Sequence, residues 1–308
     1  RLSSRSGEQA QHAGPILKKL LLIGVPITLG SSVMSIITLV DQTVVMARLQ
    51  NGLGLAEQAA AALYGQYTFG MTLFNLPATF VYPVTVSLIP AVSAALTRQN
   101  TLQANRIISS SFRLIALFSL PAGVGLSVLA QPILQLLYPA VPDTAAAAAY
   151  HLQILGAAAV FVCLMILTNA ILQACGRVYI PIVTALIGGA VKISTTYTLC
   201  GNPVFGIKGA PISTTACYAV IAVLNLCVLA AVLGKSRPRY LPLLCKPALA
   251  AALMGGCAHF VFRFLHTAAG LSPQWAVLAA IVLAASFYAF LALLLRMVTR
   301  EDLALIPK

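Results

Sequence analysis

Acidic residues are scarce in this chain, which has six aspartates and glutamates among its 308 residues. So few acids leave no paired carboxylates at the spacing of a membrane-surface active site, and the four histidines are scattered. The sequence also lacks the GxSxG, HExxH and Walker motifs of common hydrolases and nucleotide-binding proteins. These absences predict a protein that is not an enzyme and that needs neither a metal ion nor another cofactor.

Charge of either sign is rare as well, at 8% of residues, whereas soluble globular proteins carry roughly 25%. Hydrophobic residues make up 60% of the chain, and the mean hydropathy is +0.94. The net charge of +13 is not gathered into a basic patch interleaved with aromatic residues, so no nucleic acid is expected as a partner. The composition predicts an integral membrane protein surrounded by membrane lipids.

Eight uncharged or nearly uncharged apolar stretches are long enough to cross a bilayer as helices. Strand alternation is absent, so the prediction is an all-α, polytopic membrane protein with about eight transmembrane helices. The predicted spans cover residues 20–40, 67–95, 114–132, 152–172, 178–200, 209–233, 247–262 and 276–295.

The cations are distributed unevenly when the loops are assigned alternately to two sides. Fifteen of the nineteen lysines and arginines fall on the side of the N-terminus. The other side holds Arg48, Lys208 and Arg263, and Lys192 lies within a span. The positive-inside rule assigns the cation-rich side, and with it both termini, to the cytoplasm of a bacterial cell.

The second predicted span contains Pro77, Pro83 and Pro90 and has no charge from Gln58 to Thr97. Proline removes a backbone donor, so this span is expected either to be bent or locally broken beside a wet cavity, or to be an ordinary kinked packing helix. The seven cysteines show no CxxC pair and lie mostly in apolar segments, so they are interpreted as small core residues.

Two ionisable residues within or near the spans are candidate functional groups, because a charge inside a bilayer is costly. Lys192 lies about 12 Å from the end of its span at Cys200, so it is expected to face a polar cavity or else to snorkel. Asp41 closes the apolar part of the first span and either marks the interface or faces Lys192 across a shared cavity that contacts a polar headgroup.

Polar, uncharged residues in the spans are further candidates for lining a cavity or for bonding neighbouring helices. These candidates are Gln66, Asn75, Asn169 and Gln173. Three tyrosines, Tyr64, Tyr82 and Tyr138, are interpreted as interfacial or core residues instead.

Several short motifs resemble a known family. Residues 63–67 (LYGQY), 73–77 (LFNLP) and 87–91 (SLIPA), together with Gly24 to Asp41, the Lys192 helix and residues 206–215, occur in the order typical of that family. The chain is similar to the polysaccharide biosynthesis and stage V sporulation protein B family. This family belongs to the same superfamily as the MurJ lipid II flippases and the multidrug and toxin extrusion transporters.

The resemblance implies a fourteen-helix exporter with two six-helix lobes and two extra helices, of which this chain is a C-terminal fragment. Residues 1–15 would be a cytoplasmic segment, residues 16–234 the second lobe, and residues 235–308 the final helix pair with a short tail. The missing N-terminal lobe would be the chain's partner in forming a complete cavity.

The implied activity is flipping of a lipid-linked oligosaccharide or peptidoglycan precursor by alternating access, for cell-wall or spore-cortex synthesis. The partner would be an undecaprenyl-linked glycan or another anionic lipid-linked substrate, with its diphosphate near Lys192 and its prenyl tail along the last two helices. Thr72 stands where lipid II flippases carry an arginine, which leaves a related glycan open. The alternatives are a multidrug or cation antiporter that uses Asp41, a prenyl-phosphate transferase, and a structural scaffold.

Overall fold

The computed structural model describes residues 13–234, 240–268, 270–295 and 297, and the residues described form helices without strands. Most of the predicted cytoplasmic segment, the start of the predicted 235–308 segment and the C-terminal tail lie outside the described residues. The α-helices are α1 (Ala13–Ala47), α2 (Glu57–Phe74), α3 (Leu76–Thr97), α4 (Thr101–Val128), α5 (Ala130–Leu137), α6 (Pro142–Ala174), α7 (Ile180–Cys200), α8 (Gly209–Leu233), α9 (Tyr240–Arg263) and α10 (Pro273–Leu294). Three short elements join them, η1 (Arg48–Gly52), η2 (Gly206–Lys208) and η4 (Phe264–Ala268).

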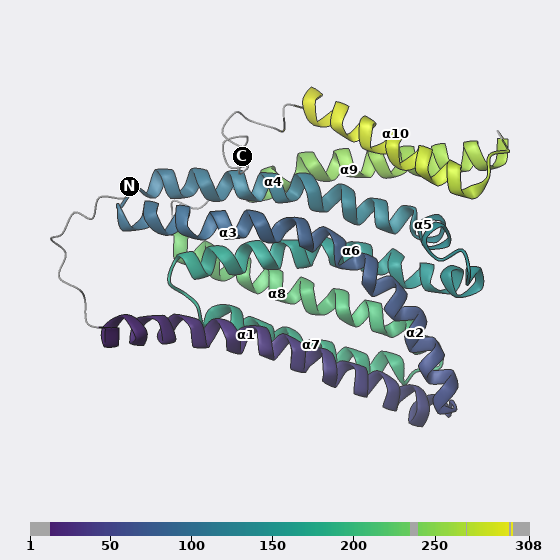
Figure 1. Cartoon of the computed structure of the whole chain (residues 1–308), viewed down its shortest axis with the longest axis horizontal. Coiled ribbons are helices and arrows are strands. Elements are labelled where there is room, and N and C mark those ends of the chain that lie inside the picture. The colour runs from purple at the N-terminus through teal and green to yellow at the C-terminus, as the bar shows by residue number, and fades with distance from the viewer. Residues whose placement is uncertain (1–12, 235–239, 269, 296, 298–308) are drawn as a thin grey trace, which may run out of the picture.

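Eight helical segments among the described residues are long and apolar enough to cross a membrane, which confirms the predicted all-α, multi-pass fold. They run back and forth between two ends of an elongated bundle (Figure 1). We call these the Arg98 end, which contains the α3–α4 and α6–α7 turns, and the Arg48 end, which contains η1 and η2. Successive turns therefore alternate between the two ends, as the charge analysis assumed.

The second span is broken, which is one of the outcomes that its prolines left open, and the break lies at Asn75 between α2 and α3. Pro77 occupies the first turn of α3, where a missing N–H costs nothing, whereas Pro83 and Pro90 lie inside that helix. Helices α2 and α3 together span Glu57–Thr97, so the break separates the half near the Arg48 end from the half near the Arg98 end.

The helices extend farther than the apolar stretches that predicted them. Arg106 and Arg113 were assigned to a loop, but both lie on α4, which begins at Thr101. Asp41 was placed at the end of its span, but α1 continues to Ala47 and η1 follows to Gly52. Hydropathy marks the apolar part of a helix and not its ends, so charged turns at the ends were missed.

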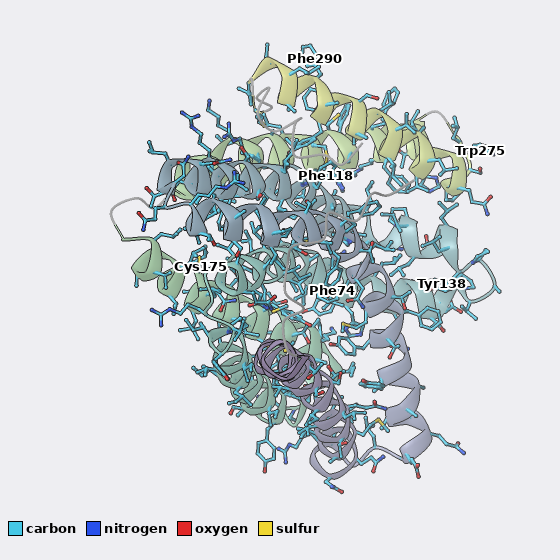
Figure 2. The ribbon with its side chains drawn as sticks, turned by 60° about the vertical axis from the view of Figure 1, so that its left-hand side comes forward. Phe74, Phe118, Tyr138, Cys175, Trp275 and Phe290 are labelled. Atoms are coloured by element: carbon cyan, nitrogen blue, oxygen red, sulfur yellow. The ribbon has the colours of Figure 1, made fainter. Side chains whose placement is uncertain are left out.

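Helix α6 lies at the centre of the bundle and is buried along most of its length, with α2, α3, α4, α5 and α8 around it. Phe74 is fully buried in this interior, whereas Trp275 and Phe290 are exposed on the outer helix α10 (Figure 2). Exposed aromatic and aliphatic side chains on α9 and α10 suit lipid contact. Helix α9 packs on α4, and α10 packs on α9.

Close packing of α4 against α6 depends on two glycines. A Cβ atom on Gly123 would lie 2.6 Å from the carbonyl oxygen of Gly156, and a Cβ atom on Gly156 would collide with Ser127 Oγ. The Ser127 hydroxyl donates to the carbonyl of Gln153 across this contact, at 2.8 Å. Small residues let two membrane helices approach this closely.

The cysteines are less uniformly internal than predicted. Cys163, Cys200 and Cys217 are buried, but Cys227 and Cys245 are exposed on the outside of α8 and α9. In a bilayer an apolar thiol is as well solvated by lipid as by protein, so hydropathy alone does not distinguish the two positions.

Candidate functional site

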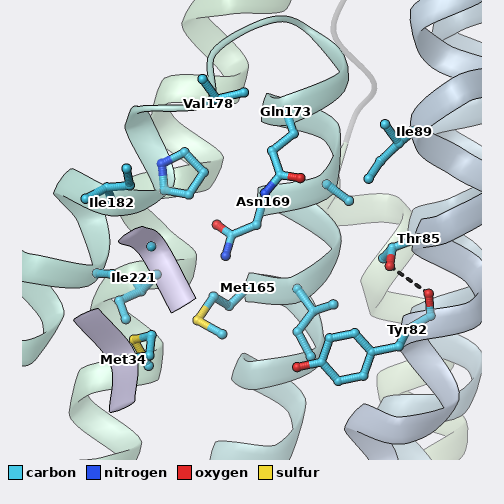
Figure 3. A pocket seen from close by; sticks show the side chains of 15 residues that line it. Met34, Tyr82, Thr85, Ile89, Met165, Asn169, Gln173, Val178, Ile182 and Ile221 are labelled. Atoms are coloured by element: carbon cyan, nitrogen blue, oxygen red, sulfur yellow. Dashed lines mark hydrogen bonds between the residues drawn. The ribbon is translucent and has the colours of Figure 1, made fainter. Parts of the chain in front are cut away.

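A cavity of about 500 Å³ lies between a wall formed by α1 and α7 and a wall formed by α3 and α6. It begins near the Arg98 end, where Gln173 and Val178 line it, and reaches Met34, Met165 and Ile221 deeper in the bundle. Its volume is within the range of about 300–1,000 Å³ that is usual for ligand pockets. Figure 3 shows the side chains that line it.

The polar groups of this cavity come chiefly from α6 and α3. Asn169 and Gln173 are one helical turn apart on α6, and both line the cavity, which is one of the two roles that the sequence left open for them. Tyr82 and Thr85 line it from α3, and the Thr85 hydroxyl donates to the carbonyl of Tyr82 at 2.7 Å. Tyr82 was interpreted as an interfacial or core residue, but 57% of its surface is exposed and it lines the cavity.

Behind Asn169, a buried hydrogen-bond network joins α6, α7 and α8. Asn225 Nδ2 donates to Asn169 Oδ1 at 2.7 Å and to Thr168 Oγ1 at 3.2 Å. The Thr184 hydroxyl donates to Asn225 Oδ1 at 2.8 Å. The Asn225 side chain is fully buried. A polar group in this position is stable only when its donors and acceptors are paired, so the network holds three helices in one register.

Lys192 and Asp41 meet outside this cavity, farther toward the Arg48 end. Lys192 Nζ lies 3.0 Å from Asp41 Oδ2, and neither residue is part of the cavity lining. The Thr196 hydroxyl donates to Asp41 Oδ1 at 2.7 Å and lies 2.8 Å from Ser213 Oγ. One of the two interpretations of Asp41 had it face Lys192 across a cavity that contacts a headgroup. The structure instead has the two charges in direct contact, so no headgroup fits between them.

Two further contacts close the bundle between the ion pair and the Arg48 end. The Tyr67 hydroxyl is 2.8 Å from Thr214 Oγ1 in a buried contact between α2 and α8. Arg48 Nε donates to the carbonyl of Tyr197 at 3.1 Å, and the guanidinium lies 4.2 Å from the centre of the Tyr197 ring. Polar contacts therefore join α1 to α7 and α2 to α8 beyond the cavity's deep end.

The remaining two candidates from the sequence lie elsewhere. Gln66 is half-buried on α2 and is not part of the cavity lining. Asn75 is exposed at the break between α2 and α3, where its side-chain amide donates to the carbonyl of Met71 at 2.9 Å. The structure thus brings together Asn169 with Gln173, and Asp41 with Lys192, at two separate places.

A second, apolar cleft of about 700 Å³ lies between α3, α4, α9 and α10. Phe80, Phe118 and Leu293 line it and are among the exposed apolar side chains. The hydroxyl of Tyr288 on α10 is buried beside this cleft and has no hydrogen-bond partner among the described residues. The cleft suits a hydrocarbon chain, because its lining is almost entirely carbon.

Comparison with known families gives a match over nearly the whole chain. The family described as Lipid II flippase MurJ matches residues 4–295. The chain belongs to this family. Its membership agrees with an all-helical bundle of eight potential membrane spans.

Individual relatives of this MurJ-family chain are longer than it is. The uncharacterized membrane protein YabM of Bacillus subtilis (strain 168) is 30% identical over 73% of the chain and 40% of the relative. Stage V sporulation protein B of the same organism is 25% identical over 94% of the chain and 54% of the relative. The chain therefore spans about half the length of the curated relatives it matches.

A solved structure of lipid II flippase MurJ in an inward closed conformation superposes with a TM-score of 0.63. The alignment covers 95% of this chain and 57% of that protein, at 18% sequence identity. At this identity the similarity shows a shared fold. It places the present MurJ-family chain in the same helical architecture.

Sequence reasoning missed several polar residues of the site. Asn225 is the central one, and its signal was a lone amide in the apolar run Leu224-Asn225-Leu226, the same kind of signal that identified Asn169. Thr184, Thr196 and Ser213 carried no comparable signal, because a threonine or serine in a membrane helix usually bonds its own backbone.

Proposed function

We propose that this MurJ-family chain is the second lobe and final helix pair of an exporter that flips a lipid-linked oligosaccharide or peptidoglycan precursor by alternating access. The observation that carries the proposal is the cavity between α1, α3, α6 and α7, which combines carboxamides with apolar walls inside a membrane bundle. A polar headgroup requires such a hydrogen-bonding interior in order to leave water.

The apolar cleft supplies a place for the other half of such a substrate. It lies along α9 and α10, the two helices that the resemblance associates with the prenyl tail. An undecaprenyl chain is a hydrocarbon, so it gains as much from this cleft as from lipid. The headgroup and the tail would then occupy two separate cavities.

The orientation follows from the charge count. The Arg98 end contains the cation-rich turns, so we place it at the cytoplasmic face of the bacterial plasma membrane, with both termini on that side. The cavity then opens near the inner leaflet, where lipid-linked precursors are assembled. The contacts of Tyr67, Arg48 and Asp41 would close the external side in this conformation.

The cation antiporter is the less favoured reading, because it needs an intramembrane carboxylate that exchanges its cation. Among the described spans, Asp41 is the acidic residue that lies away from the span ends. It is paired with Lys192 and shielded from solvent. Because Lys192 neutralises Asp41 within the protein, this carboxylate is a poor binding site for a free cation. Four of the six candidate residues thus receive a role, with Asn169 and Gln173 proposed to contact the substrate and Asp41 with Lys192 proposed to hold the cavity wall, whereas Gln66 and Asn75 lie outside the cavity.

The experiment that tests this proposal measures which leaflet exposes a labelled undecaprenyl-linked precursor in cells that express the protein from its native reading frame. The double variant Asn169→Ala/Gln173→Ala is expected to retain precursor in the inner leaflet at an unchanged protein level. Asn75→Ala, which alters an exposed amide outside the cavity, is the matched control. Normal export by the double variant, or a lowered resistance to cationic drugs in its place, would reject the flippase assignment.

A further inference from the structure

The direction of the hydrogen bonds behind the cavity decides which atoms the cavity presents. The Thr168 hydroxyl donates to the carbonyl of Leu164 at 2.8 Å, so its oxygen is left to accept a bond. The atom of Asn225 that faces Thr168 is the donor Nδ2, which matches the free lone pairs of that hydroxyl across the 3.2 Å contact. The opposite atom, Oδ1, then receives the Thr184 hydroxyl.

This arrangement also determines the orientation of the Asn169 amide. Asn225 Nδ2 donates its second hydrogen to Asn169 Oδ1 at 2.7 Å, so the acceptor atom of Asn169 is occupied on the protein side. The two N–H groups of Asn169 Nδ2 remain for the cavity, which Asn169 lines together with Gln173 (Figure 3). The Asn169 amide thus offers oriented donors to the cavity, and an acceptor oxygen on a ligand complements them.

The acceptor is better matched by a neutral oxygen than by a phosphate. No charged side chain is found among the described residues that line the cavity. An anion enclosed in an apolar site without a counter-charge is strongly disfavoured, whereas a hydroxyl or amide carbonyl with a donor is not. The exposed ring of Tyr82 on α3, in the same wall as Asn169, adds a flat apolar surface of the kind that packs on a pyranose.

We propose that this cavity is a subsite for an uncharged sugar of the lipid-linked substrate, in which Asn169 donates to a sugar hydroxyl or N-acetyl carbonyl and Asn225 is the positioning residue that orients it. The inference rests on the proposed function, and it adds which part of the substrate this lobe recognises. The diphosphate is bound elsewhere in the complete protein.

The test compares two lipids that differ only in the sugar, undecaprenyl diphosphate and undecaprenyl diphosphate carrying one N-acetylhexosamine. Binding of each to the purified protein, expressed from its native reading frame, is measured by native mass spectrometry. The wild-type protein is expected to bind the glycosylated lipid about tenfold more tightly, which corresponds to about 1.4 kcal/mol. Asn169→Ala and Asn225→Leu are expected to abolish this preference while leaving the affinity for the sugar-free lipid unchanged.

Two further variants separate positioning from folding. Thr168→Ser keeps the hydroxyl that directs Asn225 and should retain the preference, and Asn75→Ala should do so as well. Asn169→Ala removes a half-buried side chain and leaves Asn225 in place. The sugar preference can therefore be tested with this variant even if Asn225→Leu does not fold.

The outcomes distinguish this inference from the function on which it rests. If Asn169→Ala lowers the affinity for both lipids equally, the sugar subsite is overturned, because the amide would then bind the diphosphate or stabilise the fold. Equal binding of both lipids by the wild-type protein would also overturn it, while lipid export would stand. If the wild-type protein binds neither lipid, the proposed function fails together with the subsite.

Discussion

The side chains of Lys192 on α7 and Asp41 on α1 form an ion pair with an Nζ–Oδ2 distance of 3.0 Å, and the two residues are 5% and 2% exposed. Each charge alone would be costly at this depth of a membrane bundle. Together they form one of the contacts that hold α1 to α7, and these helices form one wall of the cavity. The stability of that wall therefore depends on both charges being present.

Removing one member of the ion pair should lower the free energy of unfolding more than removing both members. Lys192→Met leaves the Asp41 carboxylate buried without a partner, and we expect a loss of about 3–5 kcal/mol in the free energy of unfolding. The double variant Asp41→Asn/Lys192→Met should recover a large part of this loss. Reversible unfolding in mixed detergent micelles measures all four corners of the double-mutant cycle.

The matched control for this cycle is Lys208→Met, which removes an exposed cation near the Arg48 end. Its effect should be small, since surface charges contribute little to stability. Strict additivity of the two single variants at Asp41 and Lys192 would contradict the structural role of the pair.

The hydroxyl of Thr196 is the second support of the same carboxylate. Thr196→Val keeps the shape of the side chain but removes the donor to Asp41 Oδ1, so we expect a loss of about 1–3 kcal/mol in unfolding free energy. Thr198→Val is the control on the same helix, because Thr198 is exposed and its hydroxyl donates to the backbone carbonyl of Ser194. Equal effects of the two substitutions would show that the carboxylate does not need this hydroxyl.

The contact between α4 and α6 has no room for an additional methyl group at its two glycines. Gly123→Ala and Gly156→Ala each place a methyl group against the facing backbone or Ser127, and overpacking of this kind costs about 1–3 kcal/mol. Gly256→Ala, where a Cβ atom meets nothing within 4 Å, should be neutral or slightly stabilising. Thermal unfolding of the three variants in detergent tests the prediction, which fails if all three behave alike.

The contact of Arg48 with Tyr197 should require arginine itself. Arg48→Lys keeps the charge but cannot both stack on the ring and donate to the carbonyl as the guanidinium does, so about 0.5–1 kcal/mol should be lost. Arg98→Lys, at an exposed position on the other end, is the control. Faster hydrogen exchange at the Arg48 ends of α1 and α7, absent in the control, is the expected observation.

The number of spans and their alternation were predictable from the sequence, because hydropathy and length are local properties and a backbone in lipid has few alternatives to a helix. The prolines of the second span predicted an irregular helix, but neither that it would be broken nor that the break would lie at Asn75. The helix ends were not predictable, since the turns that carry Arg106 and Arg113 are polar and look like loops.

For the candidate site, depth along the chain brought Lys192 and Asp41 to comparable levels, and polarity within the spans gave four candidates, of which Asn169 and Gln173 line the cavity. The sequence by itself determined the class of protein, the polar residues available in each span and their depth. The tertiary structure alone decided that the two charges neutralise each other, that Tyr82 faces the cavity and that Asn225 orients Asn169. Depth follows from counting residues along one helix, whereas contact depends on the rotation and packing of several helices, which the hydropathy of any single span does not contain.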